Sequence, residues 1–283
     1  MPVDRKISIA THPMTKGLPK FNKPPVVETV LGVQFQPLAG FRNAHLGAFW
    51  KTLDANWPHV SDASLLGHDR ELFSDDRWVP GGPILQLTQT PTSRLWIRNQ
   101  NKDRMIQVQR DRLCYNWLAN KGKNQYPSYA EVRQEFDKAW DSFLRFIEQE
   151  NLGPVQPDQW EVTYVNHIPR GKLWQAPEDI PRLLEGLLAQ KKCGVWGTFE
   201  SAGGASTFVI ADNRGRLHIE FQHTRPETEE QIVLKLTARG PIDDRTDTDA
   251  GLNLGHETIV KAFADITAEY AHGSEFWDRT DDR

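Results

Sequence analysis

The chain has 283 residues, of which 38% are hydrophobic and 25% are charged, and its formal net charge at pH 7 is −4. This length and composition are typical of a globular protein with one large or two medium domains, and they exclude a disordered or fibrous chain. The slightly acidic balance also excludes a protein whose entire surface is built to bind nucleic acid.

The cysteine pattern and the lack of long apolar runs indicate the cellular compartment of the protein. Cys114 and Cys193 lie far apart and form no CxxC or Cys/His spacing, which favours a reducing cytosol over a disulfide framework or a structural zinc site. No run of about 18 apolar residues occurs in the sequence. We therefore expect a cytoplasmic protein without a membrane span. Residues 1–22 are expected to form a flexible N-terminal arm, and residues 274–283 an acidic C-terminal tail.

The first predicted element is a strand within "KPPVVETVLGVQFQPLAGF", residues 23–41. Apolar residues and a threonine alternate along it with other residues, which predicts a strand with one buried face and a solvated Gln34 on the other. Proline cannot donate to a strand ladder, so the prolines before and after this run delimit the strand. The predicted core positions are Val27, Thr29, Leu31, Val33 and Phe35.

The rest of the first half is predicted to contain a helix, a meander and a second helix. A helix with apolar positions from Leu46 to Trp57 ends at Pro58, and an acidic, turn-rich excursion follows over residues 58–83. Short alternating runs separated by turn residues predict antiparallel strands at 84–90, 94–99, 104–110 and 112–118. A long helix then carries one apolar stripe, formed by Val132, Phe136, Trp140, Phe143 and Ile147.

The same order of elements occurs again in the second half. The pattern predicts a strand over 157–168, a short helix over 178–189, and strands at 194–200, 205–211, 216–223 and 230–239. A last helix carries Ile259, Phe263, Ile266 and Tyr270 on one stripe. We therefore predict an α+β fold of two similar strand–helix–antiparallel meander–helix units, residues 23–152 and 153–273. Their element order resembles helix-grip and TATA-binding-protein-like arrangements. The units could pair edge to edge or face to face.

Several stretches together resemble a sporadically distributed family of bacterial proteins of about this length and of unknown function. They are "PPVVETVLGVQFQPL" (24–38), "QVQRDRLCYNW" (107–117), "YPSYAEVRQEFDKAWDSF" (126–143), "VTYVNHI" (162–168) and "GHETIVKAFADITAEYAHGSEFW" (255–277). The resemblance implies a compact cytoplasmic bacterial protein, with a mobile-element or antiviral-defence neighbourhood as one expected setting. It implies no catalytic residues.

Motifs of known catalytic chemistry do not occur in the sequence. A nucleophile elbow, a Walker loop, GxGxxG, HExxH and an EF-hand loop are all missing. In "LHIEFQH", alternation places His218 and Glu220 on one strand face and His223 on the other. This pair could hold a metal or could simply lie on a solvated face, and His167 could be a general base or a structural histidine. We expect no catalytic residues, no metal and no cofactor.

Local charge favours one further hypothesis. Between Arg94 and Lys123, eight basic and two acidic residues give a net charge of +6. Basic residues interleaved with aromatic residues on a sheet suit single-stranded nucleic acid, through phosphate pairing and base stacking. Such a site would use Arg94, Trp96, Arg98, Arg110, Arg112, Tyr115 and Trp117. Alternatively, the arginines are solvated and the aromatic residues face helices. Residues 241–283 carry a net charge of −7 and could dock on this region.

The ten tryptophans suggest a protein interface. Four of them fall in predicted loops or at element ends, where large aromatic residues often anchor partners, namely Trp78, Trp174, Trp196 and Trp277. Our leading hypothesis is a non-enzymatic binding protein that acts as an accessory subunit with a protein encoded nearby, or that self-associates. The alternatives are a nucleic-acid-binding accessory protein that uses the sheet over residues 94–123, and an undiagnosed metal-dependent hydrolase.

Overall fold

The computed structural model describes residues 17–67, 70–73, 93–120, 125–188, 197–225, 229–243 and 246–280. Within these ranges, 3-10 helices lie at Pro177–Asp179, Ala211–Asn213 and Glu269–His272. The strands and α-helices follow in chain order as β1 (Val26–Phe35), α1 (Asn43–Thr52), β2 (His59–Ala63), β3 (Arg94–Arg98), β4 (Arg104–Gln109), β5 (Arg112–Leu118), α2 (Tyr129–Gln149), β6 (Pro157–Pro169), α3 (Ile180–Leu183), β7 (Gly203–Ile210), β8 (Gly215–Thr224), β9 (Gln231–Pro241) and α4 (Thr248–Ile266).

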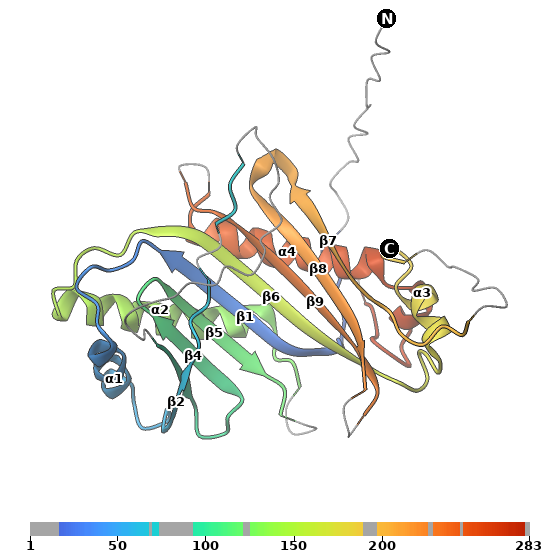
Figure 1. Ribbon diagram of the computed structural model, residues 1–283, viewed down its shortest axis with the longest axis horizontal. Coiled ribbons are helices and arrows are strands. Elements are labelled where there is room, and N and C mark those ends of the chain that lie inside the picture. Colours follow the sequence, from blue (N-terminus) through green and yellow to red (C-terminus); the bar gives the residue numbers. More distant parts are fainter. Residues whose placement is uncertain are drawn as a thin grey trace, which may run out of the picture.

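The strands form one open antiparallel sheet in the order β2-β3-β4-β5-β1-β6-β9-β8-β7, with β1 and β6 at its centre (Figure 1). The predicted α+β class with antiparallel strands is thus confirmed. Residues 23–152 and 153–273 meet edge to edge, because β1 and β6 pair along nearly their whole length. One hydrophobic cluster extends across both halves.

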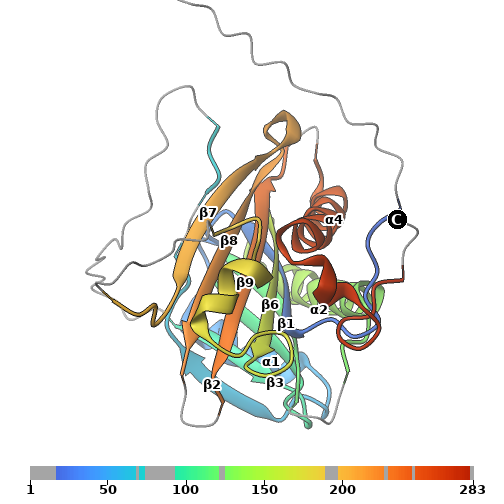
Figure 2. The same ribbon diagram turned by 90° about the vertical axis from the view of Figure 1, so that its right-hand side faces the viewer.

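Two long helices cover one face of this sheet. Figure 2 shows α2 and α4 side by side on the same side of the strands. The apolar stripe of α2 includes Val132, Phe136 and Phe143, all fully buried. On α4, Gly251 and Gly255 face the fully buried Trp160 of β6, and a Cβ at Gly251 would lie 2.2 Å from Cδ1 of that ring. Glycine therefore permits the close approach of α4 to the sheet.

The alternation in β1 predicted its core face. Thr29, Leu31, Val33 and Phe35 are all 0% exposed, whereas Val27, also predicted as a core residue, is only partly buried and lies at a shift in the register with β6. The expectation that Gln34 is solvated was wrong, because its side chain is only 3% exposed and accepts a hydrogen bond from Arg112. The opposite face of the sheet is therefore also covered at this end of β1.

Other boundaries differ from the sequence-based expectation. The first helix ends at Thr52, because Leu53 takes an extended conformation, and the Trp50 indole donates to the Trp57 carbonyl. Strand β2 lies inside the predicted excursion; its short polar sequence HVSDA gives little signal. The predicted strand 84–90 lies outside the described residues, as do residues 194–196, and residues 197–200 form no strand. The last α-helix ends at Ile266, and Tyr270 belongs to a 3-10 helix.

The described parts of the expected arm and tail pack on each other. Phe21 forms a β-bridge with Arg279, and its ring lies against Phe263 and His272 with centroids 5.3 Å apart in each case. The Lys23 amide donates to the Trp277 carbonyl. Within the described ranges, no helix combines the length and the apolar character that crossing a membrane requires.

Candidate functional site

The face of the sheet opposite α2 and α4 is strongly polar, and we call it the polar face. Strand side chains alternate between faces, so the strand register shows which residues share it. Six of these residues are Arg or Lys and three are Glu. The members that bear on the argument are Glu28, Gln34, Arg94, Trp96, Arg98, Gln107, Gln109, Arg112, Asn116, Gln159, Glu161, Thr163, Arg216, His218, Glu220, Lys235, Thr237 and Arg239.

One lateral row of this face consists of amides and an arginine. Gln109, Arg112, Gln34 and Gln159 pair successively across β4, β5, β1 and β6. All four side chains are buried although they point away from the helix layer. We call this row the amide row. Its burial shows that another part of the chain lies over it.

That part is residues 64–73, which we call the crossing segment, with residues 68–69 outside the description. The side chain of Gln109 accepts from the Leu66 amide at 3.1 Å and donates to the Leu66 carbonyl at 3.2 Å. Arg112 donates to the Gly67 carbonyl at 2.9 Å, and Gln159 accepts from the Glu71 amide at 2.8 Å. The amide row therefore holds the backbone of an extended segment that runs across the strands.

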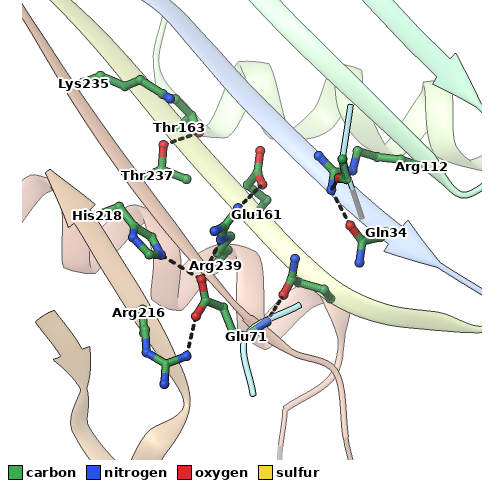
Figure 3. A network of polar contacts seen from close by, with 12 residues as sticks. Gln34, Glu71, Arg112, Glu161, Thr163, Arg216, His218, Lys235, Thr237 and Arg239 are labelled. Atoms are coloured by element: carbon green, nitrogen blue, oxygen red, sulfur yellow. Dashed lines mark hydrogen bonds and ion pairs between the residues drawn. The ribbon is translucent and has the colours of Figure 1, made fainter. Parts of the chain in front are cut away.

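The crossing segment ends in a cluster of charges on β8 and β9. The Glu71 carboxylate accepts from Arg216 Nη1 at 2.5 Å, His218 Nε2 at 2.7 Å and Arg239 Nε at 2.6 Å (Figure 3). Burial raises the pKa of Glu71, but hydrogen bonds from His218, Arg216 and Arg239 outweigh it and lower this pKa to about 2. The carboxylate is ionised at neutral pH and can only accept, so His218 Nε2 carries the proton.

A second polar network lies on β1, β4 and β5. Gln107 donates to Asn116 at 2.8 Å, and Asn116 donates to the Glu28 carboxylate at 2.6 Å. Burial raises the pKa of Glu28, although the hydrogen bond from Asn116 acts to lower it. Burial also raises the pKa of the neighbouring Cys114 thiol to about 12. A thiol with so high a pKa stays protonated and is a poor nucleophile.

The structure brings together four of the seven residues predicted to bind nucleic acid. Arg94, Trp96, Arg98 and Arg112 share the polar face. The guanidinium groups of Arg94 and Arg98 lie 5.4 and 5.2 Å from the Trp96 ring centroid, and the Trp96 indole donates to Gln107 at 3.0 Å. Cation–π contacts of this kind hold the Trp96 ring between two positive charges.

The other three predicted residues lie elsewhere. Arg110 is exposed in the turn between β4 and β5. Tyr115 and Trp117 point into the helix layer, where the Tyr115 hydroxyl donates to Glu135 at 2.9 Å and the Trp117 ring packs edge-on against Tyr126 at 5.3 Å. Tyr115 and Trp117 are therefore part of the core and do not lie beside Trp96 on the polar face.

Two of the four predicted interface tryptophans lie in the described part of the chain, and both are buried. Trp174 is 1% exposed, and its indole donates to the Ile168 carbonyl at 3.0 Å. Trp277 is 4% exposed and packs on Phe263, with ring centroids 5.0 Å apart. Both are core residues, because their neighbours in the chain's own fold cover them. Trp78 and Trp196 lie outside the described residues.

The histidines singled out in the sequence have separate partners. His218 and Glu220 share the polar face as predicted, but Glu220 pairs with Lys235 at 3.2 Å and His218 with Glu71. His223 lies on the other face against Glu230, at 2.8 Å. Where the structure describes the chain, no three His, Cys, Asp or Glu side chains are placed to hold a metal ion. Burial lowers the pKa of the half-buried His167.

Sequence reasoning missed Glu71 as the centre of the charged cluster. It is one of several acidic residues in the predicted excursion, and 145 residues separate it from Arg216. No local pattern marks it, because its partners are brought to it only by the order of the strands. Comparisons with protein-family models, curated proteins and solved structures find no match to this chain.

Proposed function

We propose that this chain is a non-enzymatic binding protein that receives a segment of a partner protein on its polar face. One observation supports the proposal most. The long helices pack on one face of the sheet, while charged and amide side chains from seven of its nine described strands share the other (Figure 2). Beyond the amide row, side chains such as Trp96, Arg98 and Lys235 remain partly exposed. These groups supply both hydrogen-bonding partners and charge for an incoming chain.

The mixed charge of the polar face favours a polypeptide over a nucleic acid. Glu28, Glu161 and Glu220 lie among the cations and would repel phosphates. Primary amides pair well with peptide backbone, as Gln109 does with Leu66. Of the predicted stacking aromatics, only Trp96 lies on this face. Binding of nucleic acid is therefore the alternative result of the purification experiment.

The charged cluster likewise favours binding over metal-dependent hydrolysis. Arg216 and Arg239 place two permanent positive charges at the Glu71 carboxylate, which is the nearest acidic partner of His218. Positive charges at this distance oppose the binding of a metal cation.

We also infer that the two halves are similar units. The order β3-β4-β5-β1 in one half corresponds to β7-β8-β9-β6 in the other, and a long helix follows β5 and β9. This order supports a TATA-binding-protein-like arrangement in which both halves contribute to one continuous binding face. The family resemblance adds the bacterial cytoplasm as the expected setting and a protein encoded nearby as the expected partner.

Purification from the native host tests the proposal. The wild type is compared with an Arg98→Glu/Lys235→Glu variant on the polar face and with a Lys138→Glu/Arg145→Glu control on exposed positions of α2. We expect a stoichiometric protein to co-elute with the wild type and the control but not with the polar-face variant, provided all three melt cooperatively.

Two other results would count against the proposal. Retention of the partner by Arg98→Glu/Lys235→Glu would show that the polar face is not its binding surface. Co-eluting nucleic acid that this variant loses would favour the nucleic-acid alternative, and a stoichiometric metal found by elemental analysis and lost on His218→Ala would favour the hydrolase.

A further inference from the structure

We propose that the crossing segment occupies, within its own chain, a binding site for an extended acidic peptide. The site consists of the amide row and the cluster of Arg216, His218 and Arg239. A partner peptide would lie across the strands and place a carboxylate where Glu71 now sits. This inference rests on the proposed function, because it specifies the chemistry of the partner that the polar face receives.

The amide row recognises backbone atoms of the crossing segment. Gln109 contacts both the amide and the carbonyl of Leu66, Arg112 contacts the Gly67 carbonyl, and Gln159 contacts the Glu71 amide. These contacts use atoms that every residue except proline carries. Another extended segment can therefore make the same hydrogen bonds whatever its side chains are.

The charged cluster selects an anion. Arg216, His218 and Arg239 all donate to one carboxylate. The next acidic group, Glu161, lies 4.0 Å from Arg239. Removal of Glu71 would leave two guanidinium groups without this partner in a largely buried place, which is unfavourable unless another anion replaces it. An exchanging peptide must therefore carry an acidic side chain at this position.

The crossing segment is held mainly by polar contacts near the surface. Strand β2 ends at Ala63, and none of the described residues of the crossing segment belongs to a helix or a strand. Leu72 is 68% exposed, and Arg216 donates to its carbonyl at 3.0 Å. The side chain of Arg70 is 40% exposed and pairs with Asp158. Segments with few buried apolar contacts open at lower free energy than the core, so the crossing segment can leave while the sheet stays folded.

Peptide binding in trans tests the inference. A fluorescently labelled peptide with the sequence SLLGHDRELF, residues 64–73, is titrated against the wild type and against Glu71→Ala, with fluorescence anisotropy as the readout. Glu71→Ala removes the resident carboxylate, so we expect it to bind the peptide at least about tenfold more tightly than the wild type does. Binding should weaken as salt concentration rises.

Two matched controls separate the cluster from general charge. Glu220→Ala removes a carboxylate from the same face of β8 but outside the cluster, and it should behave as the wild type does. A peptide in which its own glutamate is replaced by glutamine should bind Glu71→Ala at least about tenfold more weakly. Free glutamate at the same concentration should not compete, because it lacks the backbone that the amide row holds.

Hydrogen exchange on the wild type provides a measurement that does not depend on a variant. Excess peptide should increase exchange at the amides of Leu66 and Glu71, which Gln109 and Gln159 now protect. Unchanged exchange, together with no peptide binding to a cooperatively folded Glu71→Ala, would overturn the inference and make the crossing segment a permanent part of the fold. Stronger competition by a single-stranded oligonucleotide than by unlabelled peptide would also overturn it.

The two proposals can fail separately. If Arg98→Glu/Lys235→Glu loses the native partner but the peptide binds nowhere, the polar face is the partner surface and only the peptide site is wrong. If that variant keeps its partner, the proposed function fails whatever the peptide does.

Discussion

Replacement of Gly251 by alanine should destabilise the protein, because α4 packs closely on β6 at this residue. A Cβ at Gly251 would lie 2.2 Å from Cδ1 and 2.4 Å from Cγ of Trp160. The indole is fully buried, and a Cβ at Gly240 would also lie only 2.7 Å from it. The ring cannot move away, so the helix would have to shift by about 1 Å to reach an ordinary contact.

The magnitude follows from two opposing effects. Overpacking of a core typically costs 1–3 kcal/mol, and a contact with a rigid buried ring belongs near about 3 kcal/mol. Alanine in a helix regains about 1 kcal/mol over glycine. We therefore expect Gly251→Ala to lower the free energy of unfolding by about 2 kcal/mol, measured by urea denaturation followed by circular dichroism.

Gly47→Ala is the matched control for this prediction. Gly47 also lies in a helix, α1, and a Cβ there meets no atom within 4 Å. Its replacement should raise stability by up to about 1 kcal/mol through helix propensity alone. If Gly251→Ala were as stable as the wild type, or gained as much stability as Gly47→Ala, the close packing of α4 on Trp160 would be refuted.

Three further predictions concern β1, the α2–α4 contact and the polar face. Leu31→Ala should cost about 2–5 kcal/mol. Gln34→Ala should cost about 1–3 kcal/mol, because it removes a side-chain acceptor of the buried Arg112 guanidinium, which keeps its bond to the Gly67 carbonyl. A negligible effect of Gln34→Ala in a denaturant melt would contradict its burial. Burial lowers the pKa of His256, which stacks on Tyr129, from 6.5 to about 4. The unfolded chain then binds more protons, so stability should fall as pH falls from about 6.5 to about 4, by up to about 3 kcal/mol. His256→Gln should flatten this dependence, and an unchanged slope would contradict the shift. Single-stranded oligonucleotides should not bind measurably at physiological salt; micromolar, salt-sensitive binding that Arg98→Ala abolishes would contradict the proposed function.

The sequence was sufficient to predict elements whose signal is local. Alternation in β1 identified Leu31 and Val33 as core residues, and the stripe on α2 identified Val132 and Phe136, because one buried face imposes a period of about 2 or 3.6 on the chain. It could not identify Gln34 as buried. The crossing segment covers the Gln34 side chain. This segment comes from a distant part of the chain and has no periodicity of its own.

The polar face was only partly predictable for the same reason. Alternation along β5 predicted that Tyr115 and Trp117 share one face of the sheet, but alternation does not show whether helices cover that face. Only the register between strands puts Trp96 on the side opposite to them. The charged cluster around Glu71 depends on pairing among β6, β9 and β8, a non-local property that the sequence pattern does not encode.

Photo-cross-linking in the native host tests the central claim, that the polar face receives a partner protein, most directly. A photoreactive amino acid is incorporated at Trp96 on the polar face or at Lys138 on the exposed side of α2, and each strain is irradiated. The account predicts a specific protein adduct from position 96 and none from position 138. Adducts only from position 138, or adducts of nucleic acid alone from position 96, would contradict it.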